Sequence, residues 1–120
     1  MAKILVVDDE PSIRVLIRAA LEDAGHEVIE AADGPDGLAL ARSGGADVIL
    51  LDVVLPNLSG TEVCRLLRAD PSWAPAPILL LTGVEPTTPQ FGVAGRIYKP
   101  FRPQELLAQV DKALQLPMAS

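Results

Sequence analysis

The sequence is poor in cysteine, in clustered basic residues and in long apolar runs, and each shortage excludes a class of protein. Its one cysteine, Cys64, cannot form an internal disulfide, and it lies among helix-forming residues, so we interpret it as a small buried side chain without redox function. Ten Lys and Arg against 16 Asp and Glu give a net charge of −6, and no basic cluster is available to bind nucleic acid. No apolar run approaches the roughly 18 residues of a membrane span, and no signal-peptide pattern is present. We therefore expect a cytoplasmic protein with no direct nucleic-acid or membrane contact.

Apolar runs and amphipathic stretches alternate along the 120 residues, as is typical of a single α/β domain. We expect this domain to span residues 1–116, followed by a short tail at 117–120. The apolar runs predict strands at residues 3–8, 27–31, 47–52, 78–82 and 96–98. The amphipathic stretches predict helices at residues 11–24, 33–42, 60–68 and 103–114. Alternation of strands with helices predicts a parallel sheet covered on both faces.

The connection between the last two predicted strands is short. It consists of the 13 residues 83–95, which include Pro86, Pro89 and three glycines. A parallel crossover needs a dozen residues or more, and proline disrupts the interior of a helix. We therefore expect a shortened or irregular helix here, with at most one turn near residues 90–94.

Polar side chains stand at the ends of four of the five predicted strands. They are, in chain order, Asp8, Asp9 and Glu10, then Asp52, Thr82 and Lys99. Each alone could be a helix start, a turn residue or a solvated charge, but the carboxyl ends of parallel strands meet at one edge of a sheet. If the first and third strands are neighbours, their carboxylates repel one another unless a cation or protons intervene. Oxygen ligands without a Cys or His cluster favour Mg2+ over a softer metal.

The spacing of these residues resembles that of the receiver domains of two-component response regulators. Asp8 and Asp9 follow the first strand, and Asp52 ends the third. Pro56 and Gly60 fall four and eight residues beyond Asp52. The pattern continues with Thr82 and with the sequence KPF at residues 99–101. The resemblance covers the whole chain, and it implies a flavodoxin-like sheet of five parallel strands in the order 2-1-3-4-5.

The resemblance implies a phosphoacceptor signalling domain and not a dedicated enzyme. Asp52 would take a phosphoryl group from a sensor histidine kinase or a phosphotransfer protein, and the domain would assist its own phosphorylation and dephosphorylation. The resulting change of conformation would be read by a downstream protein target. The chain would act as a monomer or a weak dimer.

The resemblance also assigns roles around Asp52. Mg2+ would be held by Asp9, by Asp52 and by the backbone carbonyl of Val54, with Asp8 assisting through water. Lys99 would pair with Asp52 and then with the phosphoryl oxygens. Thr82 would donate its hydroxyl to the new phosphoryl group.

The sequence departs from the receiver pattern at Arg96. Receivers usually carry an aromatic residue three positions before the lysine, and its ring turns inward as the threonine moves toward the phosphoryl group. Tyr98 lies nearby and, by strand alternation, on the same face as Arg96. We therefore consider Thr82, Tyr98 and the atypical Arg96 as candidate switch residues.

Three other functions compete with phosphoryl acceptance. A flavodoxin-like electron carrier is disfavoured because the acidic residues 8–10 would repel the phosphate of FMN. An aspartyl-nucleophile phosphatase generally has a second Asp two residues after the first, where this chain has Val54. A degenerate receiver that acts as a phosphorylation-independent interaction module is the main alternative, because Arg96 and the short crossover alter the region through which receivers usually act on their targets.

Overall fold

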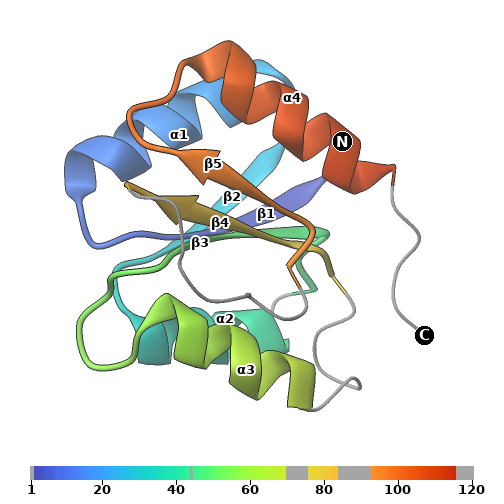
Figure 1. Ribbon diagram of the computed structural model, residues 1–120. Coiled ribbons are helices and arrows are strands. Elements are labelled where there is room, and N and C mark those ends of the chain that lie inside the picture. Colours follow the sequence, from blue (N-terminus) through green and yellow to red (C-terminus); the bar gives the residue numbers. More distant parts are fainter. Residues whose placement is uncertain (1, 44, 70–75, 84–92, 116–120) are drawn as a thin grey trace.

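The computed structural model describes residues 2–43, 45–69, 76–83 and 93–115 (Figure 1). Its strands are β1 (Lys3–Val7), β2 (Glu27–Ala31), β3 (Val48–Asp52), β4 (Ile78–Thr82) and β5 (Gly95–Tyr98). Its helices are α1 (Pro11–Asp23), α2 (Gly34–Ser43), α3 (Gly60–Ala69) and α4 (Pro103–Leu114). Every predicted strand and helix in these residues is confirmed, with bounds that differ by one residue at most. None of the helices in the described part of the chain is long and apolar enough to cross a membrane.

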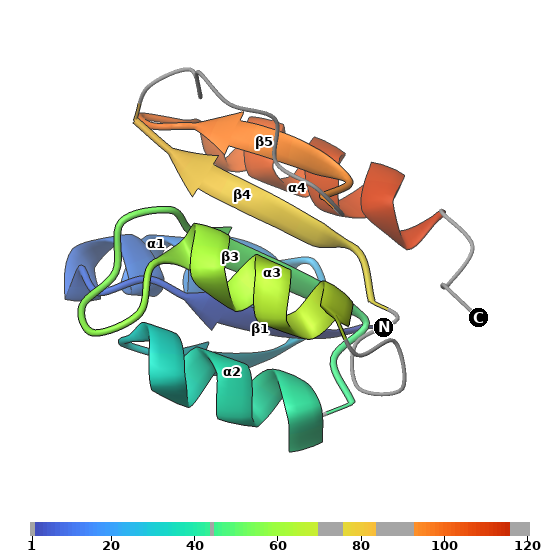
Figure 2. The same cartoon turned by 60° about the horizontal axis from the view of Figure 1, so that its bottom comes forward.

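The strands form one parallel sheet in the order β2-β1-β3-β4-β5, which confirms the predicted topology. β1 and β3 are neighbours, with Val7 opposite Leu51, so the segments that follow them start side by side. Helices α1 and α4 cover one face of the sheet, and α2 and α3 cover the other (Figure 1). Seen toward the second face, α2 and α3 lie next to each other, and β4 and β5 lie beyond α3 (Figure 2). All residues of β3 and β4 are buried, as expected for central strands covered on both faces.

Alternate residues of each strand supply two hydrophobic cores, one on each face. The first core joins residues such as Val6 and Leu50 to Ile17 of α1 and Val110 of α4. The second joins the intervening strand residues to α2 and α3, and it contains Cys64, whose predicted burial is confirmed. Because both cores hold the strands in place, the positions of their carboxyl ends are well defined, and so are those of the polar residues that follow them.

The crossover from β4 to β5 is described only in part. Residues 84–92 lie outside the described residues, and the prediction of one helical turn near residues 90–94 falls largely on them. Within the described residues no helix joins β4 to β5. The tail at 117–120 also lies outside the described residues.

Candidate functional site

Asp8 lies directly beyond the end of β1 and is completely buried, with 0% of its surface exposed. Its backbone N–H donates to the carbonyl of Ala31 at 3.1 Å, so the start of this turn is tied to the end of β2. Its Oδ1 accepts a hydrogen bond from the Glu10 N–H at 2.9 Å, and its Oδ2 accepts one from Lys99 Nζ at 2.8 Å. Asp9, the next residue, is exposed. The turn therefore presents one buried carboxylate and one that solvent can reach.

Asp52, the last residue of β3, is 6% exposed and is held through both carboxylate oxygens. Its Oδ1 accepts a hydrogen bond from the Val54 N–H at 3.1 Å, and its Oδ2 accepts one from Lys99 Nζ at 3.0 Å. Val54 itself is 77% exposed, so solvent reaches the loop next to Asp52. The carboxylate is thus oriented before any reaction partner arrives.

Two glycines allow the loop after Asp52 to pack closely against the starts of α2 and α3. The Gly60 N–H donates to the Val53 carbonyl at 2.9 Å, and a Cβ on Gly60 would lie only 1.9 Å from the carbonyl oxygen of Asp52. A Cβ on Gly34 at the start of α2 would lie 2.0 Å from the carbonyl oxygen of Leu58. Glycine at both positions lets α2 and α3 begin against the loop that carries Val54.

Lys99 connects three of the strand ends. Its backbone N–H donates to the Thr82 carbonyl at 2.7 Å, which joins the end of β5 to the end of β4. Its Nζ lies within hydrogen-bond distance of Asp8 and Asp52, as given above, and 3.9 Å from Glu10 Oε1. Thr82 is buried beside this group. The structure thus brings together Asp8, Asp52, Thr82 and Lys99, which the sequence placed at four separate strand ends.

Burial is the largest single influence on the pKa of both Asp52 and Lys99. It raises the pKa of Asp52, and the negative charge of Asp8 adds to this increase, against the opposing hydrogen bonds from Lys99 and Val54. Burial also acts to lower the pKa of Lys99, but hydrogen bonds to Asp8 and Asp52 and the charges of both outweigh it and raise that pKa. One ammonium therefore compensates the two buried carboxylates only in part, and a further cation would be favourable here.

The carboxylates are close enough to share such a cation. Asp8, Asp9 and Asp52 each offer an oxygen, and these oxygens lie within 4.8 Å of one another. Oxygen donors at this spacing, in a site with an exposed side at Asp9 and Val54, fit a small hard divalent ion that keeps some of its waters. The donor set agrees with the Mg2+ predicted from the sequence, whereas the part of the Val54 carbonyl stays a prediction.

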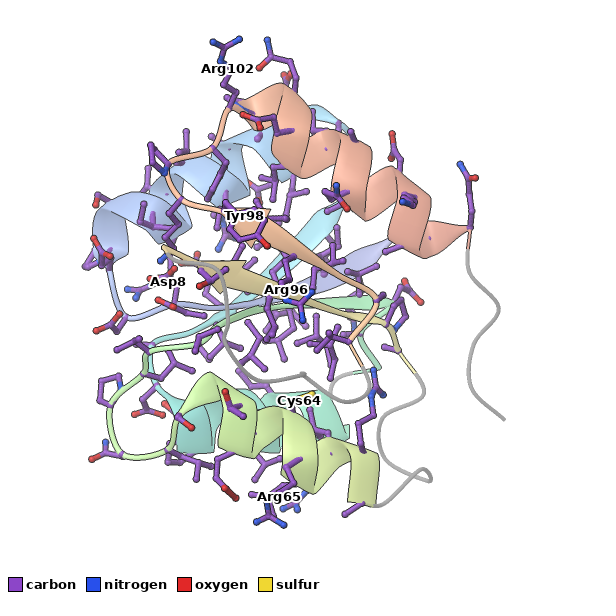
Figure 3. The ribbon with its side chains drawn as sticks, in the orientation of Figure 1. Asp8, Cys64, Arg65, Arg96, Tyr98 and Arg102 are labelled. Atoms are coloured by element: carbon purple, nitrogen blue, oxygen red, sulfur yellow. The ribbon has the colours of Figure 1, made fainter. Side chains whose placement is uncertain are left out.

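The candidate switch residues lie on β4 and β5. The sheet register places Thr82 opposite Tyr98 and Leu80 opposite Arg96. Ile97 is buried against α4 and Tyr98 is 44% exposed, so the predicted alternation, with Arg96 and Tyr98 on one face, is confirmed. Arg96 Nε is buried and has no hydrogen-bond partner in the described part of the chain. Figure 3 shows Tyr98 toward the end of β5 that leads to Lys99 and Arg96 nearer its start.

One charged residue at the edge of the site, Arg14, was not among the residues predicted from the sequence. Arg14, in the first turns of α1, donates from Nη1 to the Asp8 backbone carbonyl at 2.6 Å. The only hint in the sequence is that Arg14 lies four residues after Glu10, so both residues lie on the side of the helix start that carries the acidic residues.

Comparison with known proteins identifies the family. The sequence matches the family described as the response regulator receiver domain over residues 4–111. The chain belongs to this family. Receiver domains are signalling domains that act with histidine kinases or phosphotransfer proteins and with downstream targets. The chain is accordingly a receiver domain of the phosphoacceptor signalling type.

Relatives and solved structures agree over nearly the whole chain. Protein PilH of Pseudomonas aeruginosa is 35% identical over 119 residues, which cover 95% of this chain and 98% of PilH. The chemotaxis response regulator CheY4 of Vibrio cholerae is 39% identical, with a TM-score of 0.84 and coverage of 94% and 98%. The receiver domain of the sensor histidine kinase PA1611 of Pseudomonas aeruginosa is 30% identical, with a TM-score of 0.87 and coverage of 94% and 97%. That structure contains a magnesium ion coordinated in its active-site cleft.

Several other relatives are longer. The chain spans about half the length of the DNA-binding regulators that it matches.

Proposed function

We propose that this receiver domain, which we take to span residues 1–116, accepts a phosphoryl group on Asp52 from a sensor histidine kinase or a phosphotransfer protein. The observation that carries the proposal is the orientation of the Asp52 carboxylate, fixed by the Val54 N–H on one oxygen and by Lys99 Nζ on the other. Holding the carboxylate in this way reduces the entropy cost of aligning it with the donor. The domain assists this transfer and the later hydrolysis, but it is not a dedicated enzyme.

Mg2+ is the cofactor of the proposed reaction. Asp9, Asp52 and the Val54 carbonyl would hold it, with Asp8 assisting through water. Bound there, Mg2+ would offset the repulsion between the Asp52 carboxylate and the incoming phosphoryl group. The raised pKa of Asp52 supports this role, because it reflects a carboxylate whose negative charge the protein alone does not fully compensate.

Lys99 and Thr82 would respond to the new phosphoryl group. Lys99 Nζ already contacts Asp52 and would pass to a phosphoryl oxygen, while the Thr82 hydroxyl would donate to another. Charge-assisted hydrogen bonds contribute about 1.5–3 kcal/mol each. Moving a two-state protein from 1:99 to 99:1 needs about 5.5 kcal/mol, so the two bonds would supply much of the switch. Tyr98, opposite Thr82, and the atypical Arg96 would carry the change toward a downstream protein target.

Phosphorylation of the purified protein tests the assignment. Wild type, Asp52→Asn and the control Asp111→Asn, which alters an exposed carboxylate of α4, are incubated with acetyl phosphate and Mg2+ and analysed by intact mass spectrometry. We expect one added phosphoryl group on wild type and on Asp111→Asn, and none on Asp52→Asn. Labelling of Asp52→Asn at the wild-type stoichiometry would refute Asp52 as the acceptor.

The second candidate function is a phosphorylation-independent interaction module. Its support is Arg96, which replaces the usual aromatic residue on the face shared with Tyr98. Beryllofluoride with Mg2+, followed by NMR, distinguishes the two functions. Shifts at Thr82 and Tyr98 as well as at Asp52 are expected for a phosphoacceptor, whereas a wild type that neither binds beryllofluoride nor becomes labelled would favour the interaction module.

A further inference from the structure

We propose that Arg14 is a positioning residue of the acidic site, which holds the turn of Asp8 and Asp9 in the geometry that binds a divalent cation. The inference rests on the proposed function, because it concerns the same metal site. The Arg14 guanidinium donates in two directions: from Nη1 to the Asp8 carbonyl at 2.6 Å and from Nε to Glu30 Oε1 at 3.1 Å.

The Asp8 carbonyl belongs to the peptide group that joins Asp8 to Asp9. Because a peptide group is planar, its orientation determines the direction in which the chain enters Asp9. The other side of Asp8 is already fixed, since its N–H donates to Ala31 at the end of β2. Arg14 therefore restrains the peptide group through which the chain enters the exposed Asp9, and so helps to place its carboxylate relative to Asp52.

The ion pair with Glu30 holds the Arg14 guanidinium in place. Glu30 lies on β2 in register with Val6, inside the paired part of the sheet. The side chains of Arg14 and Glu30 are only 19% and 28% exposed, so their ion pair is better shielded from water than a typical surface pair. The planar guanidinium suits two simultaneous hydrogen bonds, which a lysine ammonium on a flexible stem matches poorly. The positive charge also lies at the edge of a site that carries excess negative charge.

Arg18 provides a matched control in the same chain. It lies one turn later on α1 and donates to the same Glu30 carboxylate, and its Nε pairs with Glu22 at 3.2 Å. Its described hydrogen bonds and ion pairs are to these two glutamates and include no residue of the acidic site. Loss of Arg18 therefore removes a Glu30 ion pair without freeing the Asp8 carbonyl. Methionine keeps much of the apolar stem of either arginine.

The experiment measures the Mg2+ dissociation constant of wild type, Arg14→Met and Arg18→Met by NMR titration, together with thermal unfolding in EDTA. Loss of a residue that orients metal ligands typically weakens metal binding by about 10-fold to 100-fold, so we expect about a tenfold weaker Mg2+ affinity for Arg14→Met. Arg18→Met should bind Mg2+ as wild type does. A general loss of stability would instead lower the melting temperature without separating the two variants in Mg2+ affinity.

The outcomes separate this inference from the proposed function. Equal Mg2+ affinity in wild type and Arg14→Met, with Asp52 still phosphorylated in wild type, would overturn the positioning role and leave the proposed function standing. A wild type that binds no Mg2+ and accepts no phosphoryl group would overturn both. If Arg14→Met does not fold, Arg14→Lys decides, because it keeps the charge and loses the two-directional hydrogen bonding; wild-type affinity in that variant would refute the inference.

Discussion

Replacing Lys99 by methionine would leave the buried carboxylates of Asp8 and Asp52 without the ammonium that they share. Methionine preserves much of the apolar stem, so the change removes mainly the charge and its hydrogen bonds. The Nζ atom lies 2.8 Å from Asp8 Oδ2 and 3.0 Å from Asp52 Oδ2. At an effective dielectric constant of about 20, each distance corresponds to a Coulomb attraction of roughly 6 kcal/mol before desolvation is subtracted.

The expected net loss is smaller than these attractions. Burial of Lys99 opposes its charged state, and removal of one partner from a buried ion pair typically costs 3–5 kcal/mol. Because the Lys99 side chain is still 18% exposed, we expect a loss near the lower end, about 3 kcal/mol at pH 7 without metal. At about 4 °C per kcal/mol, this corresponds to a melting temperature lower by roughly 12 °C.

The loss should depend on pH in a defined direction. The pKa of Asp52 is already raised, and removal of Lys99 takes away hydrogen bonding and charge that lower it, so the pKa rises further. A group with a raised native pKa is favourable below its unfolded pKa, and this contribution is lost as the pH rises through the native value. The Lys99→Met protein should therefore recover part of the lost stability as the pH falls toward 4, because protonation of Asp52 then removes one of the uncompensated charges.

Thermal and urea unfolding at pH 7 and pH 4 in EDTA measure both effects. Lys112→Met, which removes an exposed lysine of α4, is the control and should change stability by no more than about 0.5 kcal/mol. Mg2+ should restore part of the stability of Lys99→Met at pH 7, because it supplies positive charge to the same carboxylates. A loss below about 1 kcal/mol, or an equal loss at both pH values, would refute the role of Lys99 as the shared counter-charge of Asp8 and Asp52.

Two further substitutions test the construction of the site. Asp52→Asn should raise the melting temperature of the metal-free protein at pH 7, because the raised pKa means that the ionised carboxylate costs stability there, and the gain should disappear near pH 4; a lower melting temperature at pH 7 would contradict the assigned pKa direction. Gly60→Ala should cost more than about 3 kcal/mol in urea unfolding and weaken Mg2+ binding, since its Cβ would lie 1.9 Å from the Asp52 carbonyl oxygen. Gly83→Ala, whose Cβ would meet no atom within 4 Å, is the control and should be tolerated.

The fold could be predicted from the sequence because its signals are local. The buried runs VILLD and ILLLT of β3 and β4 lack polar positions before their last residue, which is typical of strands covered on both faces. Pro11 and Pro103 begin α1 and α4, as the preference of proline for the first helical position suggests. The Glu62 N–H donates to Ser59 Oγ at 3.2 Å, so the serine directly before α3 caps its start, as its residue type favours. Each signal needs only the residues next to it.

The sequence predicted which strand ends carry the polar residues of the site, but not the contacts between their side chains. Lys99 and Asp8 are 91 residues apart, and their 2.8 Å contact depends on the registers of all the strands between them. The raised pKa of Asp52 likewise depends on its burial and on the charge of Asp8 at another strand end, and no short motif encodes either. Arg14 was missed for a different reason, because an arginine in a helix start is usually a solvated charge and its partner here is a backbone carbonyl only six residues away.

The position of Lys99 suggests where the signal leaves the site. Its Nζ binds the carboxylate that we expect to be phosphorylated, while its backbone N–H binds the Thr82 carbonyl at 2.7 Å. A phosphoryl group on Asp52 would therefore act on the end of β4 twice, through the Thr82 hydroxyl and through the lysine bonded to the Thr82 backbone. Thr82 is the register partner of Tyr98 on the neighbouring strand β5, and Tyr98 is half-exposed. We therefore expect the output of this domain to leave through β5, with Arg96 as the neighbouring charged group on the same face.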